Sequence, residues 1–319
     1  MAKHKKLRTT LIIILSVLIV LAGLVVGGAF YLVNFALNPK MDDRKETLDY
    51  FVEKYPQMSP WLDSLMQNDA VRDTFVLSED GVMLHASYVK ARQETKHTAV
   101  IIHGYGNCNI NMLHIGYMYH HDLGYNILLP DLRYAGLSGG NAIQMGWKDR
   151  KDIMRWIDIA PEMFGDSLRV AVHGISMGGA TTMMVSGEDL PDYVKLFVDD
   201  CGYTSVWDQF AKELKETFHL PTFPILNIAS RICDMKYGWN FKEASSIEQV
   251  KKCRLPMLFI HGDEDAYVPT WMVYKLYEAK PEPKELWVSE GVQHARSYRI
   301  HPEEYTIKVR NFTEKYIDK

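Results

Sequence analysis

The chain has 319 residues, of which 47% are hydrophobic and 24% charged, a composition typical of one enzyme-sized globular domain. Its formal net charge is −4, but residues 1–40 contain five of the 36 Lys and Arg residues and none of the 40 acidic residues, so the remainder is more acidic, at about −9. This balance argues against a nucleic-acid partner, because phosphate binding requires a basic surface.

The first predicted element is a membrane-spanning helix over residues 11–33, in which almost every side chain is apolar and none is charged. At about 1.5 Å per residue, a helix of this length crosses a hydrocarbon core of about 30 Å. Basic residues gather before it and acidic residues follow it from Asp42 onward, so the positive-inside rule predicts a cytoplasmic segment over residues 1–10 and an extracytoplasmic remainder. We therefore expect a single-pass protein of the cell membrane, with the lipid bilayer as a partner.

Two other interpretations of this segment remain open. A cleaved signal peptide would use the small residues Gly27, Gly28 and Ala29, although the apolar stretch exceeds the usual h-region of about 7–15 residues. A buried core helix is disfavoured, because the segment is apolar all round and precedes the rest of the chain. We favour an uncleaved anchor.

A stalk and helical lead-in is expected over residues 34–70, between the anchor and a globular domain over residues 71–319. Residues 42–54 are typical of an amphipathic helix, which two prolines separate from a second short helix over residues 61–67. We expect this lead-in to pack on the domain.

The globular domain begins with a predicted hairpin over residues 74–77 and 82–89, because two β-rich runs flank an Asp-Gly turn. Segments of helical periodicity, such as residues 147–163 and 181–184, separate the strands that follow. Those strands are predicted over residues 98–102, 126–129, 168–172, 196–199, 257–260 and 285–288. The alternation predicts an α/β fold with a mostly parallel central sheet and helices on both faces, and a site at the carboxyl ends of the strands.

Residues 205–245 interrupt this alternation between two predicted core strands. The segment is rich in aromatic side chains, and Pro221 and Pro224 break it. We interpret it as a small lid insertion.

The strongest chemical motif is Gly-Ile-Ser-Met-Gly, a G-x-S-x-G that follows a predicted strand and opens a predicted helix. A nucleophile in this motif occupies a tight, strained turn, and Gly174 and Gly178 leave room for the chain to pass close to its neighbours. Ser176 is therefore the predicted nucleophile, and the backbone N–H of Met177 is one predicted donor to the oxyanion. The strand–turn–helix setting disfavours an accidental match in a loop.

A serine nucleophile needs a base to take its proton, and the base needs an acid that orients it. In this class of motif the acid and the histidine follow the serine in that order. Asp263 and Asp265 come after one of the last two predicted strands, and His294 comes after the other. The order of the residues is the one that the chemistry requires.

From about residue 70 to the C-terminus, the chain resembles the α/β-hydrolase superfamily, nearest its prolyl-oligopeptidase-like and serine-aminopeptidase-like branch. Besides G-x-S-x-G, an H-G-x-x-D turn ends at Asp265 before a Val-Pro pair, and a late histidine is matched by His294. The resemblance implies an α/β-hydrolase fold and assigns these two residues to the triad. Asp263 is then expected to support the turn by backbone hydrogen bonding, and Asp200 is a rival because some family members place the acid there.

The resemblance also implies the second oxyanion donor. His103 and Gly104 resemble the family's H-G oxyanion loop, which puts the backbone N–H of Tyr105 in position. Residues 131–138 depart from the common D-x-R-G-H-G-x-S pattern at their centre. We interpret them as structural, with Arg133 in an ion pair.

Together these residues predict acyl transfer to water through an acyl-enzyme, with no metal or organic cofactor implied. We expect a carboxylic ester or other small acyl compound as substrate, and the aromatic side chains of residues 205–245 favour an apolar acyl group or a lipid. Two alternatives remain: a serine peptidase acting on short peptides, and a non-catalytic membrane-tethered protein that kept the fold.

The four cysteines have neither C-x-x-C nor histidine spacing, so a zinc or redox site has no support. We expect small buried residues, with a disulfide between Cys233 and Cys253 as the alternative. The other two cysteines are Cys108 and Cys201.

Overall fold

The computed structural model describes residues 2–41 and 43–319, so Met1 and Asp42 lie outside the described residues. Eight strands form one sheet in the order β1-β2-β4-β3-β5-β6-β7-β8. Their bounds are β1 Arg72–Leu77, β2 Met83–Val89, β3 His97–Ile102, β4 Asn126–Asp131, β5 Arg169–Ile175, β6 Val194–Asp200, β7 Met257–Gly262 and β8 Lys284–Ser289. β1 and β2 form an antiparallel hairpin, β2 pairs antiparallel with β4, and the other neighbours are parallel. The predicted hairpin and mostly parallel sheet are confirmed.

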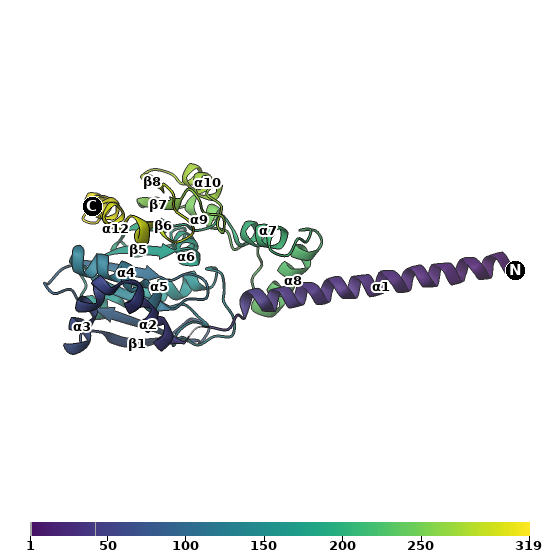
Figure 1. Ribbon diagram of the computed structural model, residues 1–319, viewed down its shortest axis with the longest axis horizontal. Coiled ribbons are helices and arrows are strands. Elements are labelled where there is room, and N and C mark those ends of the chain that lie inside the picture. Colours follow the sequence, from purple (N-terminus) through teal and green to yellow (C-terminus); the bar gives the residue numbers. More distant parts are fainter. Residues whose placement is uncertain (1, 42) are drawn as a thin grey trace.

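Helices cover both faces of the sheet (Figure 1). Successive residues of a central strand point to opposite faces, so Val172 joins the core cluster that contains Trp156 of α5 (Asp149–Phe164), whereas Ala171 joins the cluster that contains Tyr305 of α12 (Pro302–Tyr316). The helices after α1 are α2 Arg44–Lys54, α3 Ser59–Gln67, α4 Leu113–Tyr117, α5 Asp149–Phe164, α6 Met177–Val185, α7 Val206–Glu216, α8 Ile225–Tyr237, α9 Ser246–Val250, α10 Trp271–Ala279, α11 Ser297–Ile300 and α12 Pro302–Tyr316, with short 3-10 turns at Pro56–Met58 and Asn109–Met112 and a π turn at Met118–Asp122.

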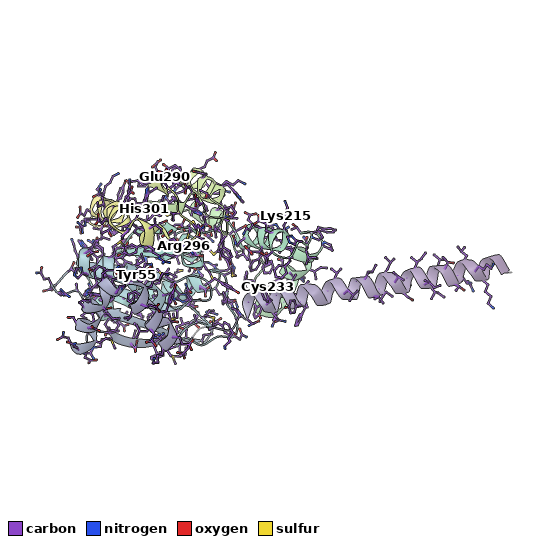
Figure 2. All side chains as sticks on the ribbon, viewed as in Figure 1. Tyr55, Lys215, Cys233, Glu290, Arg296 and His301 are labelled. Atoms are coloured by element: carbon purple, nitrogen blue, oxygen red, sulfur yellow. The ribbon has the colours of Figure 1, made fainter. Side chains whose placement is uncertain are left out.

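One long helix, α1 (Ala2–Leu37), projects away from the sheet (Figure 1). From Lys5 onward it is long and apolar enough to cross a membrane. Most side chains along its projecting part stand clear of the rest of the chain (Figure 2), whereas a stripe with four-residue spacing, Ala29, Val33 and Leu37, is buried. The helix therefore continues past Val33, and its last turns pack on the globular part of the chain.

The segment between α1 and the hairpin packs against one face of the sheet. Asp42 lies outside the described residues, and the helix predicted over residues 42–54 is present from Arg44 as α2, with the carboxylate of Asp43 capping it by accepting hydrogen bonds from two backbone N–H groups. Phe51 of α2 and Trp61 of α3 are buried in the same core cluster. The lead-in therefore shares a buried core with the sheet.

Residues 205–245, which we call the lid segment, contain α7 and α8. Both helices lie on the side of the sheet from which α1 projects (Figure 1), and α8 packs along the last turns of α1. Lys236 Nζ donates a hydrogen bond to Asn34 Oδ1 at 2.6 Å, and Tyr237 Oη donates to Asn38 Oδ1 at 2.8 Å. Side chains of α8 therefore hold the end of α1 in place.

The loop after β4, at residues 131–138, is held by ion pairs. Arg133 contacts Asp80 at 2.9 Å and the buried Asp152 at 2.6 Å, so its predicted pairing is confirmed. Tyr134, one of the departures from the family pattern, donates a hydrogen bond to the carbonyl oxygen of Pro39 at 3.3 Å. This loop thus supports the segment that follows α1.

The cysteines do not pair within the described chain. All four are buried and free, so the alternative of a disulfide between Cys233 and Cys253 is wrong. Cys233 lies on the face of α8 that packs into the core. The thiol of Cys253, which follows α9, donates a hydrogen bond to the Leu255 carbonyl oxygen at 3.4 Å. Each thiol is accommodated as a small buried side chain, which is the expectation that we favoured.

Candidate active site

Ser176 occupies the turn between β5 and α6. Its φ of 60° and ψ of −119° lie in a region that residues with side chains rarely adopt. A Cβ on Gly174 would lie 2.0 Å from the carbonyl oxygen of Gly178, and a Cβ on Gly178 would lie 2.1 Å from the carbonyl oxygen of Ile102. The predicted need for glycine at both positions is confirmed, because only glycine permits these close approaches.

Ser176, His294 and Asp265 form one hydrogen-bonded chain. Ser176 Oγ lies 2.8 Å from His294 Nε2, and His294 Nδ1 lies 2.7 Å from Asp265 Oδ2. The three side chains come from the turns after β5, β8 and β7, which meet at the carboxyl edge of the sheet. An ionised Asp265 accepts from Nδ1–H, which leaves Nε2 free to accept the hydroxyl proton of Ser176.

The surroundings of Asp265 hold it in the charged form. Its Oδ1 accepts hydrogen bonds from the backbone N–H groups of Tyr267 and Val268, both at 2.9 Å. His261 Nε2 lies 3.4 Å from Asp265 Oδ2. Burial opposes ionisation, but the hydrogen bonds from His261 and His294 outweigh it and lower the pKa of Asp265 to about 2. No sequence signal predicted this contact of His261 with the acid.

The two rival acids lie elsewhere. Asp263 Oδ1 accepts a hydrogen bond from the Val292 N–H at 3.2 Å, which is the turn-supporting role expected for it. Asp200 accepts a hydrogen bond from the Tyr305 hydroxyl at 2.9 Å, and burial raises the pKa of Asp200 to about 6. Neither carboxylate has a hydrogen bond to His294 within the described chain. The acid that the structure places beside His294 is therefore Asp265, which the resemblance favoured.

The loop after β3 lies directly against the nucleophile. A Cβ on Gly104 would be 3.4 Å from Ser176 Cβ. His103 Nε2 accepts a hydrogen bond from the Leu132 N–H at 2.9 Å, so its Nδ1–H donates to the Gly104 carbonyl oxygen, also at 2.9 Å. Because C=O and N–H point in opposite directions across a trans peptide, this bond turns the Tyr105 N–H away from His103. Burial lowers the pKa of His103, which favours the neutral ring that both bonds require.

Both predicted oxyanion donors remain available. Within the described residues, neither the Tyr105 N–H nor the Met177 N–H donates a hydrogen bond to another protein group. Met177 is the first residue of α6, where the helix leaves its N–H groups unpaired and directs positive potential outward. Met177 directly follows Ser176 in the sequence, and Tyr105 lines the same two cavities as Ser176, an arrangement that suits the two amides to an oxyanion site.

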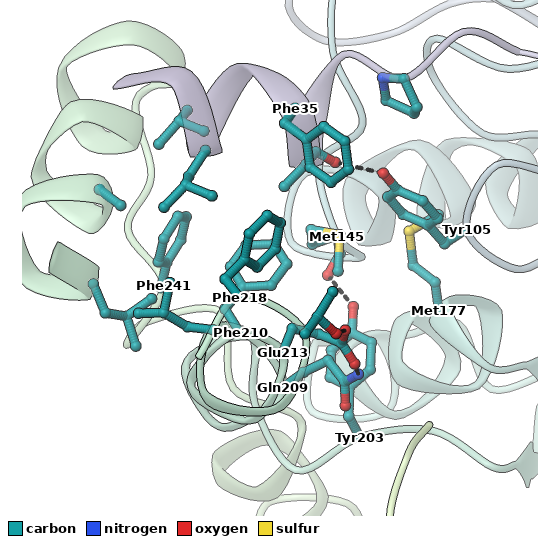
Figure 3. A pocket seen from close by; sticks show the side chains of 18 of the residues that line it. Phe35, Tyr105, Met145, Met177, Tyr203, Gln209, Phe210, Glu213, Phe218 and Phe241 are labelled. Carbon is teal, nitrogen blue, oxygen red and sulfur yellow. Dashed lines mark hydrogen bonds between the residues drawn. The ribbon is translucent and has the colours of Figure 1, made fainter. Parts of the chain in front are cut away.

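Two cavities meet at Ser176. The larger, about 590 Å³, lies between α1, α7, α8 and the nucleophile, and we call it the apolar cavity (Figure 3). The smaller, about 370 Å³, lies on the side of α2, and we call it the polar cavity because Lys54, Asn107, Asn111 and Arg296 are among its lining residues. Ser176, Tyr105 and Tyr267 line both. Tyr267 also packs against the His294 ring, with centroids 4.9 Å apart, a contact that no sequence signal predicted.

One cluster of potential metal ligands overlaps this site. Ligand atoms of Cys201, Asp265 and His294 all lie within 4.8 Å of one another. Burial raises the pKa of the Cys201 thiol well above its usual value, so the thiol stays protonated, and His294 Nδ1 already bonds to the carboxylate. The cluster therefore fits a hydrogen-bonded acid–base pair better than a metal centre.

Comparison with known proteins agrees with this architecture. Residues 117–319 match the model of the prolyl oligopeptidase family. The chain is 30% identical over 231 residues to the uncharacterized protein YqkD of Bacillus subtilis, covering 72% of this chain and 75% of that protein. It is 23% identical over 206 residues to the uncharacterized membrane protein YNL320W of Saccharomyces cerevisiae, covering 65% and 66%.

A solved structure has the same fold. The esterase Pf2001 of Pyrococcus furiosus superimposes with a TM-score of 0.63 at 23% sequence identity, covering 77% of this chain and 93% of that one. The family model spans more than half of the chain, including the turns that carry Ser176, Asp265 and His294. The chain therefore belongs to the prolyl oligopeptidase family, and it is a serine hydrolase of the α/β-hydrolase fold.

Proposed function

We propose that this protein is a membrane-anchored carboxylic-ester hydrolase that uses Ser176 as nucleophile, His294 as general base and acid, and Asp265 as the orienting acid. The observation that carries the proposal is the unbroken chain of hydrogen bonds from Ser176 Oγ through His294 to Asp265. A non-catalytic protein of this fold does not need these hydrogen bonds beside two unpaired amide groups. The geometry therefore counts against the non-catalytic alternative.

In the acylation step, Ser176 Oγ bonds to the ester carbonyl carbon while its proton passes to His294 Nε2. The carbonyl π electrons move to the oxygen, and the N–H groups of Tyr105 and Met177 stabilise the resulting oxyanion. The bond to the alcohol oxygen then breaks, the alcohol leaves with the proton from His294, and Ser176 carries the acyl group. Asp265 stays ionised throughout and stabilises the imidazolium.

In the deacylation step, water takes the place of the alcohol. His294 removes a proton from the water, whose oxygen attacks the acyl carbon, and the same two amides stabilise the second oxyanion. Collapse returns the proton to Ser176 Oγ and releases the carboxylic acid. The complete cycle consumes one ester and one water and yields one alcohol and one acid.

The lining of the apolar cavity favours an ester over a peptide. Its walls are mainly Leu, Val, Phe, Ile and Ala side chains, with few polar groups facing it. A peptide would lose hydrogen bonds from its backbone in such a cavity, whereas an acyl chain has none to lose. The family to which the chain belongs is named for a peptidase, so hydrolysis of short peptides is the second candidate function.

Activity is tested with the full-length chain in detergent or nanodiscs. We expect a fluorophosphonate probe to label the wild type but not Ser176→Ala, and we expect p-nitrophenyl esters to turn over faster than matched aminoacyl and dipeptidyl amides. An unlabelled wild type would refute the hydrolase assignment. Faster amide turnover would replace it with the peptidase.

The location that we propose is the cell membrane, with the N-terminus cytoplasmic and the catalytic domain extracytoplasmic. The length and apolar character of α1 and the naming of the yeast relative as a membrane protein support the anchor, and the basic residues before the apolar stretch support the orientation. A membrane-impermeant fluorophosphonate should label Ser176 on intact cells. Labelling that appears only after lysis would reverse the topology.

A further inference from the structure

The end of α1 forms a wall of the apolar cavity. Four residues from the last two turns of this helix line the same space as Ser176: Leu32, Val33, Phe35 and Ala36. Figure 3 shows Phe35 and Tyr105 at this wall, opposite Phe210 and Phe218 of the lid segment. A helix that served only as a tether would have no side chains in the active-site cavity.

Hydrogen bonds from two parts of the domain fix this wall. Tyr105 Oη donates to the carbonyl oxygen of Ala36 at 2.8 Å, and the Ile143 N–H donates to the carbonyl oxygen of Leu37 at 2.8 Å. These bonds satisfy carbonyl groups that the last turn of a helix leaves unpaired. The position of α1 relative to Ser176 is therefore defined by the fold.

The lid segment completes the cavity from the other side. Phe218 packs edge-on against Phe35 with ring centroids 5.7 Å apart, and Leu226 and Ala229 of α8 line the space beneath α1. Phe223 of the same segment is 77% exposed, although it is large and apolar. A side chain of this kind, next to a membrane-spanning helix, is suited to the lipid interface.

Two cavities of different character, one lined mainly by apolar side chains and one of mixed polarity, suit a substrate with two different ends. The apolar cavity falls within the range of about 300–1,000 Å³ that is usual for small-molecule sites. The polar cavity adds two cationic side chains, Lys54 and Arg296, on the other side of Ser176. An ester bond placed at Ser176 would have its acyl chain in the first cavity and its alcohol in the second.

We propose that the last turns of α1 are part of the acyl-binding pocket, and that the substrate is an amphiphilic ester of the bilayer whose acyl chain lies between α1 and the lid segment. Its polar alcohol occupies the polar cavity. This inference rests on the proposed esterase function and specifies its substrate class. The membrane is the source of the substrate because the wall of the pocket continues directly into the apolar, exposed part of α1.

The experiment compares full-length variants in nanodiscs, using p-nitrophenyl esters that differ only in acyl length. Ala36→Phe fills the pocket from α1, Ala229→Phe fills it from α8, and Ala22→Phe adds the same volume on the exposed face of α1 as a matched control. We expect kcat/KM for the dodecanoyl ester to fall about tenfold or more in both pocket variants. The fall for the acetyl ester should be much smaller, so the ratio of dodecanoyl to acetyl kcat/KM should drop, whereas Ala22→Phe should match the wild type.

Labelling by a small fluorophosphonate reports whether each variant keeps an intact Ser176, and Ala36→Leu provides a milder filling if Ala36→Phe does not fold. Labelled pocket variants with an unchanged acyl-length profile would overturn the inference and leave the esterase proposal standing. A wild type that prefers water-soluble acetyl esters over long-chain esters in the bilayer would also overturn it. A wild type that hydrolyses no ester would instead refute the proposed function.

Discussion

The phenol of Tyr105 donates a hydrogen bond to the carbonyl oxygen of Ala36 at 2.8 Å. Tyr105 thereby joins two features that are far apart in the sequence: its backbone N–H faces the proposed oxyanion, and its side chain holds the last turn of α1. Tyr105 therefore contributes both to the proposed oxyanion site and to the wall of the apolar cavity. The first prediction separates these two roles of one residue.

Replacing Tyr105 by Phe removes the phenol and keeps the backbone N–H. We expect the variant to lose about 1 kcal/mol of stability, because the carbonyl oxygen of Ala36 loses its partner. KM for long-chain esters should rise several-fold while kcat for the acetyl ester stays near the wild-type value, since only the pocket wall is loosened. Thermal unfolding and steady-state kinetics measure these effects, and an equal fall in kcat for both esters would show that the side chain acts in the oxyanion site itself.

Replacing Asp265 by Asn should reduce kcat for the acetyl ester by about 10³–10⁴-fold, because the amide favours the wrong tautomer of His294. Asp200→Asn is the matched control at the rival position. It should retain activity within about tenfold, because among the described residues Asp200 bonds to Tyr305 and not to His294. If the two variants exchanged these outcomes, Asp200 would be the triad acid.

Substituting Ala at Gly178 should abolish fluorophosphonate labelling and destabilise the fold, because the added Cβ would lie 2.1 Å from the carbonyl oxygen of Ile102. Gly27→Ala is the matched control, since nothing lies within 4 Å of a Cβ at that position. It should leave labelling and unfolding temperature unchanged. Full labelling of Gly178→Ala would mean that the turn at Ser176 relaxes far more easily than its geometry implies.

The raised pKa of Asp199 predicts that the free energy of unfolding falls as the pH rises. Burial raises the pKa of Asp199 from 3.8 in the unfolded chain to about 8 in the folded protein. Between pH 4 and pH 8 the unfolded state therefore loses a proton that the folded state keeps, which lowers the free energy of unfolding as the pH increases. Asp199→Asn should reduce the difference between urea unfolding at pH 5 and at pH 8, and an undiminished difference would assign the effect to other buried acids.

The lowered pKa of Asp265 predicts the opposite trend at low pH, where the free energy of unfolding falls as the pH falls. Its folded-state pKa, lowered to about 2, lies below the unfolded value of 3.8, so its contribution to stability is complete above pH 4 and disappears as the pH falls toward 2. The acid limb of the unfolding profile should be less steep in Asp265→Asn than in the wild type. Equal limbs would indicate that other carboxylates dominate acid unfolding.

Much of the fold and of the candidate site followed from local patterns in the sequence. The predicted strands alternate between apolar and polar residues or are wholly apolar, and the glycines around Ser176 indicate a tight turn. The order of Ser176, Asp265 and His294 along the chain reflects their positions in turns that follow three strands. Such signals are readable because each depends on neighbours within a few residues. The apolar run from Leu11 likewise indicated a helix that could cross a membrane.

Other features were decided only by the tertiary structure. The sequence left Asp265, Asp263 and Asp200 as candidates that only the resemblance ranked, and the bond to His294 depends on how three separate turns meet at one edge of the sheet. The unpaired state of Cys233 and Cys253 likewise reflects where α8 and the loop after α9 pack.

The role of the last turns of α1 is the clearest case. By composition these turns belong to an apolar helix and its stalk, and nothing local marks them as part of a site. They line the cavity because α8 packs along them and because Tyr105 and Ile143 bond to their terminal carbonyl groups. These contacts join residues more than 60 positions apart, and an apolar side chain is compatible with lipid, with a protein core and with a pocket wall alike. Only the packing of the whole chain distinguishes among the three.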